Sequence, residues 1–130
     1  MPKAVHHIAF ICHDRLKQEE FYTAVLGFRR VRVFNRGTPD EFVMLRLGET
    51  CIELFSGATG RPAENAAGFK HLAFDVVDLD KSVEKLRAAG VEVGAAIDCS
   101  GIAPGMRVCF FKDPEGNDLE YMENWADETV

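Results

Sequence analysis

The sequence lacks closely paired cysteines. Its four cysteines stand at positions 12, 51, 99 and 109, and no two of them have C-x-x-C spacing. We interpret them as partly buried thiols that a reducing compartment keeps reduced, without a redox or nucleophilic role. A chain of 130 residues, 47% of them hydrophobic and 28% charged, can bury one core as a single domain without disulfides.

Long apolar stretches are also missing. Residues 1–11 carry a lysine and two histidines within a short apolar run, and so do not resemble a signal peptide or a membrane span. We therefore expect a cytoplasmic protein with no membrane partner.

Clustered positive charge is scarce. The formal net charge is −6, and the one tight basic cluster consists of Arg29, Arg30 and Arg32. Nucleic-acid binding needs Lys and Arg gathered against phosphates, so we expect no nucleic-acid partner. We interpret the arginine cluster as the solvated edge of a strand.

The clearest positive signal is an internal duplication. The motif HIAF at residues 7–10 returns as HLAF at residues 71–74. Each copy precedes an amphipathic stretch that ends at a glycine and predicts a helix, over residues 14–26 and 80–89. The repeat therefore extends beyond the motif.

Both predicted helices carry end signals. Asp14 and Asp80 are the expected N-caps, and Gly27 and Gly90 the expected stops. We expect the first helix to bury a set of apolar residues. These are Leu16, Phe21, Val25 and Leu26.

Three strands are predicted after each helix. They cover residues 28–34, 42–47 and 51–55 in the first half, and 91–97, 106–111 and 118–122 in the second. The fold class is therefore α+β, with two tandem βαβββ modules in one domain, 1–130. The modules span about residues 4–56 and 69–124, joined by a connector at about 57–68.

Strand alternation chooses among the histidines. His7 shares a face with Ala9 and Ile11, while the residues between them point toward the helix. His71 occupies the equivalent position in the second copy. His6 does not, and is the poorer candidate for a functional role.

The last strand of each module adds an acid in an apolar setting. Glu53 lies within CIELF and Glu120 within DLEYM, and each follows its own histidine by a similar interval. A lone strand glutamate usually faces water, but these four polar residues obey one repeat. If both sheets curl and pair, His7, Glu53, His71 and Glu120 meet in one cavity.

Two carboxylates in one cavity would repel each other unless a cation joined them. Two imidazoles and two carboxylates suit Zn, Ni, Mn, Co or Fe, and they leave two octahedral positions for water or substrate. We therefore predict one divalent metal ion per site. A curved sheet with exposed edges, and apolar residues near Phe34, Phe42 and Trp125, also favours a homodimer. The sequence leaves open whether one chain or two build each site.

The chain resembles the vicinal oxygen chelate superfamily over residues 5–122. The resemblance rests on HIAF, FYTAVLGF, IEL, GFKHLAF and FKDPEGN. It implies curved mixed sheets around a metal-binding cavity.

Within that superfamily the complete ligand set is similar to glyoxalase I. The resemblance implies a lyase or isomerase of the lactoylglutathione lyase class, with Ni or Zn as the metal. Its small-molecule substrate would be a thiol hemithioacetal of methylglyoxal, converted through a metal-chelated enediolate. Glu120 would be the base and Glu53 the group that returns the proton.

One departure from glyoxalase I concerns the thiol. Glutathione-dependent bacterial members tend to carry Arg and Asn where this chain has Ile11 and Gly57. Neither residue here can bind the carboxylate or amide groups of glutathione, so we expect weak glutathione activity.

Other members of the superfamily provide the alternatives. Methylmalonyl-CoA epimerase shares the enolate chemistry but usually has Gln in place of Glu53. Fosfomycin-inactivating thiol transferases and extradiol dioxygenases use three ligands. A metabolite- or antibiotic-binding protein, in the manner of bleomycin-binding members, has no metal site.

Overall fold

The computed structural model describes residue 1 and residues 3–129. It divides the chain into two compact units, Met1–Ala66 and Ala67–Val130. Across the described residues, no helix is both long enough and apolar enough to cross a membrane.

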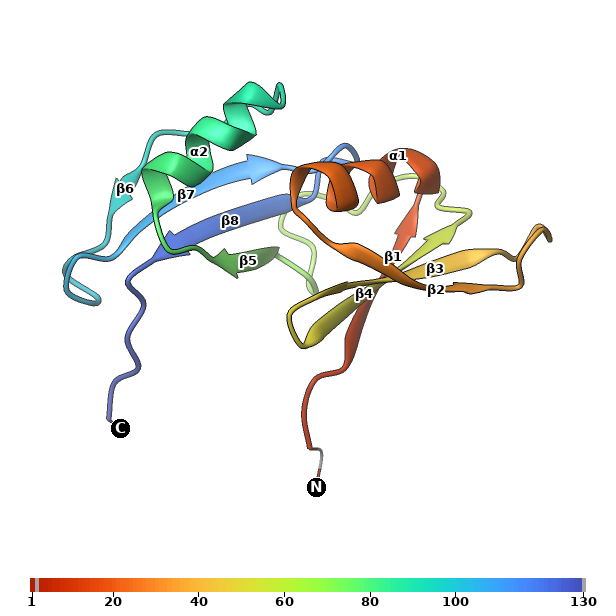
Figure 1. Cartoon of the computed structure of the whole chain (residues 1–130), viewed down its shortest axis with the longest axis horizontal. Coiled ribbons are helices and arrows are strands. Elements are labelled where there is room, and N and C mark those ends of the chain that lie inside the picture. The colour runs from red at the N-terminus through yellow and green to blue at the C-terminus, as the bar shows by residue number, and fades with distance from the viewer. Residues whose placement is uncertain (2, 130) are drawn as a thin grey trace. The chain divides into compact units, whose positions relative to one another are not determined.

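The first unit is a four-stranded mixed sheet with one helical segment on one face (Figure 1). The strand order is β1-β4-β3-β2, with β1 parallel to β4 and the other pairs antiparallel. In chain order the elements are β1 (His7–Cys12), α1 (Arg15–Glu20), the π-helical turn η1 (Phe21–Val25), β2 (Arg29–Phe34), β3 (Phe42–Leu47) and β4 (Thr50–Ser56).

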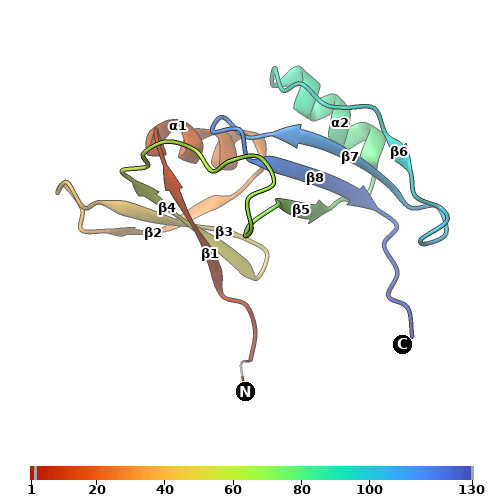
Figure 2. The same ribbon diagram turned by 180° about the vertical axis from the view of Figure 1, so that it is seen from behind.

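The second unit repeats this topology. Its strand order is β5-β8-β7-β6, again with the first strand parallel to the last. Its elements are β5 (His71–Asp75), α2 (Leu79–Ala88), β6 (Ile97–Asp98), β7 (Arg107–Lys112) and β8 (Asp118–Glu123). The duplicated βαβββ pattern and the α+β class are confirmed, and residues 57–70 connect the units without a helix or strand (Figure 2).

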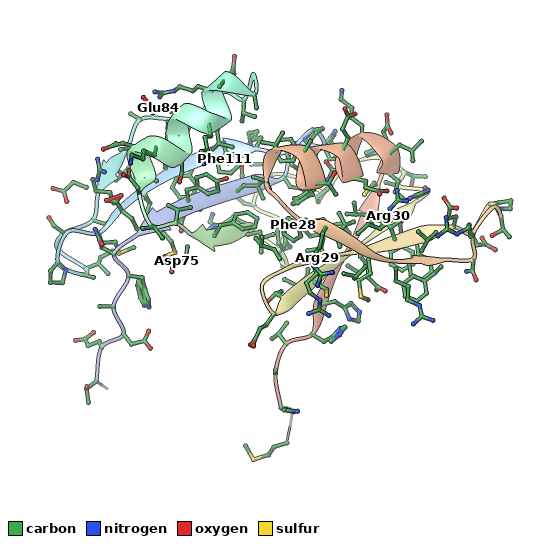
Figure 3. All side chains as sticks on the ribbon, in the orientation of Figure 1. Phe28, Arg29, Arg30, Asp75, Glu84 and Phe111 are labelled. Carbon is green, nitrogen blue, oxygen red and sulfur yellow. The ribbon has the colours of Figure 1, made fainter. Side chains whose placement is uncertain are left out.

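Each core lies between the helix and one face of its own sheet. In β3 of the first unit the buried residues alternate with more exposed ones, as the period of two requires, whereas β4 buries the adjacent Cys51 and Ile52. In the second, Phe111 lies between α2 and the sheet (Figure 3). The fully buried strand residues are Cys12, Val43, Leu45, Cys51, Ile52, Leu54, Cys109 and Leu119.

The first helix differs from the prediction of one regular helix over 14–26. Asp14 caps it as expected, accepting the Lys17 amide at 3.0 Å, but α1 ends at Glu20 and continues as η1. The expected apolar face is also wrong at its start, because Leu16 is 67% exposed while Glu19 is buried. Tertiary ion pairs explain the burial of Glu19, as described below.

Two predictions in the second unit need correction. Asp78, not Asp80, caps α2 by accepting the Lys81 amide at 3.1 Å. The strand expected over 91–97 shrinks to β6 and an isolated bridge from Val93 to Phe111. Glycine and alanine fill residues 94–96, and both have low strand propensity.

Candidate metal centre

His7 and Glu53 form a contact on the open face of the first sheet. In the β1–β4 register His7 is opposite Cys51, so Glu53 lies two positions further along and on the same face. His7 Nε2 is 3.1 Å from Glu53 Oε1, with the side chains 41% and 13% exposed. One imidazole and one carboxylate therefore converge beside solvent.

The second sheet repeats this register. His71 is opposite Asp118 in the β5–β8 register, which again places Glu120 two positions further along. The Phe110 ring stands edge-on to His71 with centroids 5.9 Å apart, and Phe110 is paired with Glu120 across β7 and β8. The two modules thus place histidine and glutamate in the same register.

His6 contacts the other ring nitrogen of His7. The two Nδ1 atoms are 3.0 Å apart and the rings stand nearly perpendicular, at 88°. One Nδ1 must donate and the other accept, so His6 helps select the His7 tautomer and leaves Nε2 directed at Glu53. The alternation of strand side chains in the sequence gave His6 no role, because the second copy of the repeat contains no equivalent histidine.

Each unit alone supplies only part of a ligand set. Within residues 1 and 3–129, no three His, Cys, Asp or Glu side chains form a group that could hold a metal ion. The donor chemistry of each His–Glu pair fits a borderline divalent cation, but such ions usually take at least three protein ligands. Each histidine and glutamate together therefore offer two of the ligands that such an ion needs.

The positions associated with thiol recognition are open and apolar. The side chain of Ile11 is 66% exposed on the His7 face. Gly57 has a φ of 98°, which strains any residue with a Cβ. Neither position offers a hydrogen-bond donor from a side chain.

The cysteines are not candidate ligands of this centre, although Cys51 is opposite His7 in the β1–β4 register. All four are thiols, and Cys12, Cys51 and Cys109 are buried. Burial raises the pKa of the Cys109 thiol, which keeps it protonated at neutral pH. This agrees with the interpretation of the cysteines as structural residues.

Curated relatives match nearly the whole chain. YwkD of Bacillus subtilis (strain 168), described as uncharacterised, is 38% identical over 126 residues, covering 93% of this chain and 97% of its own. A 2-epi-5-epi-valiolone epimerase of Actinomyces sp is 31% identical over 141 residues, covering 90% of this chain and 77% of its own.

A solved structure and a family model agree with these relatives. The glyoxalase family protein from Enterococcus faecalis is 31% identical with a TM-score of 0.79, over 93% of this chain and 98% of its own. The family model named Glyoxalase/Bleomycin resistance protein/Dioxygenase superfamily matches residues 4–121. The chain, with its repeated βαβββ modules and paired His–Glu positions, belongs to this superfamily.

Proposed function

We propose that the protein is a metal-dependent, glyoxalase-like lyase or isomerase. His7, Glu53, His71 and Glu120 together would hold one divalent ion, Ni or Zn in the first place and Mn, Co or Fe by the same donor chemistry. The observation that carries the proposal is the identical register of histidine and glutamate in the two sheets. Members of this superfamily commonly bind a divalent metal, which supports it.

The proposed reaction moves a proton at a carbon next to a carbonyl group. A bound divalent ion would act as a Lewis acid that stabilises the negative charge developing on the substrate oxygens. Glu120 is the proposed base that removes the carbon-bound proton. Glu53, whose Oε1 lies 3.1 Å from His7 Nε2, is the proposed group that returns it to the neighbouring carbon.

The substrate class follows from this chemistry. A thiol hemithioacetal of methylglyoxal has the two adjacent oxygens and the acidic carbon that the reaction requires. Ile11 and Gly57 argue against glutathione as the thiol, because neither supplies a polar side chain on this face.

An epimerase is the second candidate. It would use the same two carboxylates to remove and return a proton at one carbon, without transfer to a neighbour. The 31% identical relative named as an epimerase favours this reading. A methylmalonyl-CoA epimerase-like activity is therefore tested beside the glyoxalase activity.

The deciding experiment combines metal analysis with a substrate panel. The protein is loaded with each metal in turn, its metal content is measured, and turnover is followed on hemithioacetals of several thiols and on acyl-CoA esters. Thioester formation supports the lyase, and proton exchange with deuterated water without thioester supports the epimerase. Stoichiometric metal without proton exchange on any substrate would favour thiol transfer, and absence of metal would favour a binding protein.

The proposed assembly is a homodimer. Trp125 is 53% exposed, and the exposed edge strands of each sheet also need cover. Light scattering near micromolar concentration should give about twice the chain mass, since symmetric dimers are the commonest oligomers. A fully metal-loaded, active monomer would contradict this.

Mixing two inactive variants decides whether one chain or two build each site. His7→Ala and His71→Ala are unfolded and refolded together. If each site takes one module from each chain, half of the mixed molecules are heterodimers and one of their two sites is intact, which restores about a quarter of wild-type activity. If each site lies within one chain, no activity returns.

A further inference from the structure

Three arginines share the sheet face that carries His7 and Glu53. One row of paired residues crosses the sheet from β1 to β2. Cys51 on β4 is opposite His7 on β1, Arg46 on β3 is opposite Cys51, and Arg29 on β2 is opposite Arg46. Directly paired residues of a sheet point to the same side, so this row lies on one face.

A second row runs beside the first. Glu53 on β4 is opposite Ala9 on β1, Met44 on β3 is opposite Glu53, and Arg32 on β2 is opposite Met44. Arg46 and Arg32 therefore stand two strands from His7 and Glu53 respectively. A β-bulge between Arg30 and Arg32 brings this about, because it adds a residue that turns Arg32 to the face of Arg29.

These arginines keep their charge available. Among the described residues, none of Arg29, Arg32 and Arg46 forms an ion pair with a carboxylate. Arg46 Nη1 donates only to the backbone oxygen of Glu49, at 3.4 Å, and the Arg32 guanidinium lies 5.2 Å from the Phe34 ring centroid.

Arg30 shows the alternative arrangement. It extends toward α1, on the side of the sheet opposite Arg29, and pairs with the buried Glu19 (Figure 3). The basic cluster predicted as a solvated strand edge is therefore divided, with one structural arginine and two on the site face.

The equivalent face of the second sheet lacks this charge. Lys112 takes the place of Arg46 in the row of His71, but its Nζ is 2.5 Å from Asp118 Oδ1. The first unit has nine Lys and Arg against eight Asp and Glu, a net charge of +1. The second has six against thirteen, a net charge of −7.

We propose that Arg32 and Arg46, with Arg29 behind them, bind a carboxylate or phosphate group carried by the substrate. The inference rests on the proposed function, because it places the reacting oxygens of that substrate beside His7 and Glu53. Two strand spacings separate backbones by about 10 Å, and an extended arginine side chain covers much of that distance. Guanidinium groups bind both anions well.

These arginines supply the side-chain hydrogen-bond donors that Ile11 and Gly57 lack. An anionic group would be recognised from β2 and β3, not from β1 and the loop after β4. The site would therefore prefer a compact substrate with its anion close to the reacting carbon over the extended glutathione adduct.

The test compares two metal chelators that differ by one anionic group. Acetohydroxamate presents two adjacent oxygens, and phosphoglycolohydroxamate adds a phosphate. Calorimetric titration of the nickel-loaded protein should show the phosphate-bearing probe binding at least about tenfold more tightly, as expected for charge-assisted hydrogen bonds. Rising salt should reduce that advantage.

The variant Arg32→Gln/Arg46→Gln should lose this advantage and keep its affinity for acetohydroxamate. Arg36→Gln is the control, because it removes one positive charge from the nearby β2–β3 loop and should change neither affinity. Arg32 is exposed and Arg46 is only partly buried, so the double variant should fold, which the melting temperature verifies. Equal probe affinities in the wild type, or an equal loss in Arg36→Gln, would overturn the inference and leave the proposed function standing.

A metal-free arm separates the two proposals. Inorganic phosphate should raise the melting temperature of the metal-free protein, and the double variant should not respond. If neither hydroxamate binds and no metal is retained, the proposed function fails, and the phosphate response alone decides the arginine site. No phosphate response in that case would overturn the inference as well.

Discussion

The two halves of this protein have the same strand order and the same His–Glu register, yet their open faces differ in charge. Glu53 and Glu120 occupy equivalent positions in the two sheets. Around them the first sheet places Arg32 and Arg46, while the second places the neutralised pair of Lys112 and Asp118. Positions that the repeat matches are alike in the two halves, and positions beside them differ. We infer that equivalent positions serve the metal and non-equivalent positions serve substrate choice.

The halves also differ in how the helix is tied to the sheet. In the first, Glu19 on α1 pairs with Arg15 and reaches Arg30 on β2. In the second the acid lies on the sheet, and Glu123 Oε1 accepts the Leu79 amide at the start of α2, at 2.7 Å. Arg107 then bridges Glu123 and Asp80.

The largest expected effect tests the equivalence of the two glutamates. Glu53→Gln and Glu120→Gln should weaken metal binding to a similar extent, which chelator competition measures. At saturating metal, Glu120→Gln should lower kcat further, by about 10²- to 10⁴-fold, because it also removes the proposed base. A greater kcat loss in Glu53→Gln would reverse the assigned roles.

His13→Ala is the control for these variants. Its Nε2 lies 2.8 Å from the Gly60 backbone oxygen. His13 is also not one of the four positions that the sequence repeat proposes as ligands. Metal affinity and kcat should both stay near wild type.

The second effect is on stability and separates the two helix anchors. Glu19→Gln removes the buried carboxylate that Arg15 and Arg30 share. Arg15, only 9% exposed, keeps Glu41 at 2.6 Å, and the loss should be about 2–3 kcal/mol of unfolding free energy. Glu123→Gln should cost less, about 1–2 kcal/mol, because Arg107 is 35% exposed and keeps Asp80. Urea unfolding measures both values, and a larger loss for Glu123→Gln would contradict the comparison.

A smaller effect concerns acid stability. The Gly37 backbone amide, with Arg15, holds the pKa of Glu41 below its ordinary 4.5, and the Ser100 hydroxyl and amide lower the pKa of Asp98 from 3.8. A lowered folded pKa stabilises the protein above the unfolded value, and that contribution is lost as pH falls through the folded value.

The first unit should therefore respond to acid at a higher pH than the second. Glu41→Gln should make the decline in melting temperature shallower from just below pH 4.5, and Asp98→Asn only below pH 3.8. The same onset in both variants would show that these contacts do not set the acid response.

The smallest effect is on thiol reactivity. Cys99 is only partly buried, whereas burial raises the pKa of Cys109. A thiol reagent at neutral pH should therefore modify Cys99 first, and Cys99→Ser should remove the fast phase. Rapid labelling of Cys109 in the native protein would contradict the packing of the second core.

Sequence periodicity predicted what depends on local order. The repeat of HIAF as HLAF and the strand period of two correctly placed His7 and His71 on strands in equivalent registers. Boundaries were harder, because the region before α2 contains several aspartates and the sequence favours none of them. In the structure Asp78 is the N-cap of α2, and Asp80, within the first turn, pairs with Arg107.

The sequence by itself determined the duplicated modules and the four candidate ligands, since both follow from the repeated motif and from periodicities of two and about four residues. Only the tertiary structure decided the burial of Glu19, because its partner Arg30 comes from another element. It also decided the arginine face. In a regular strand Arg29 and Arg32 would point to opposite sides, and the β-bulge between Arg30 and Arg32 reverses that parity. A bulge depends on how two strands pair, and one strand's sequence does not specify it.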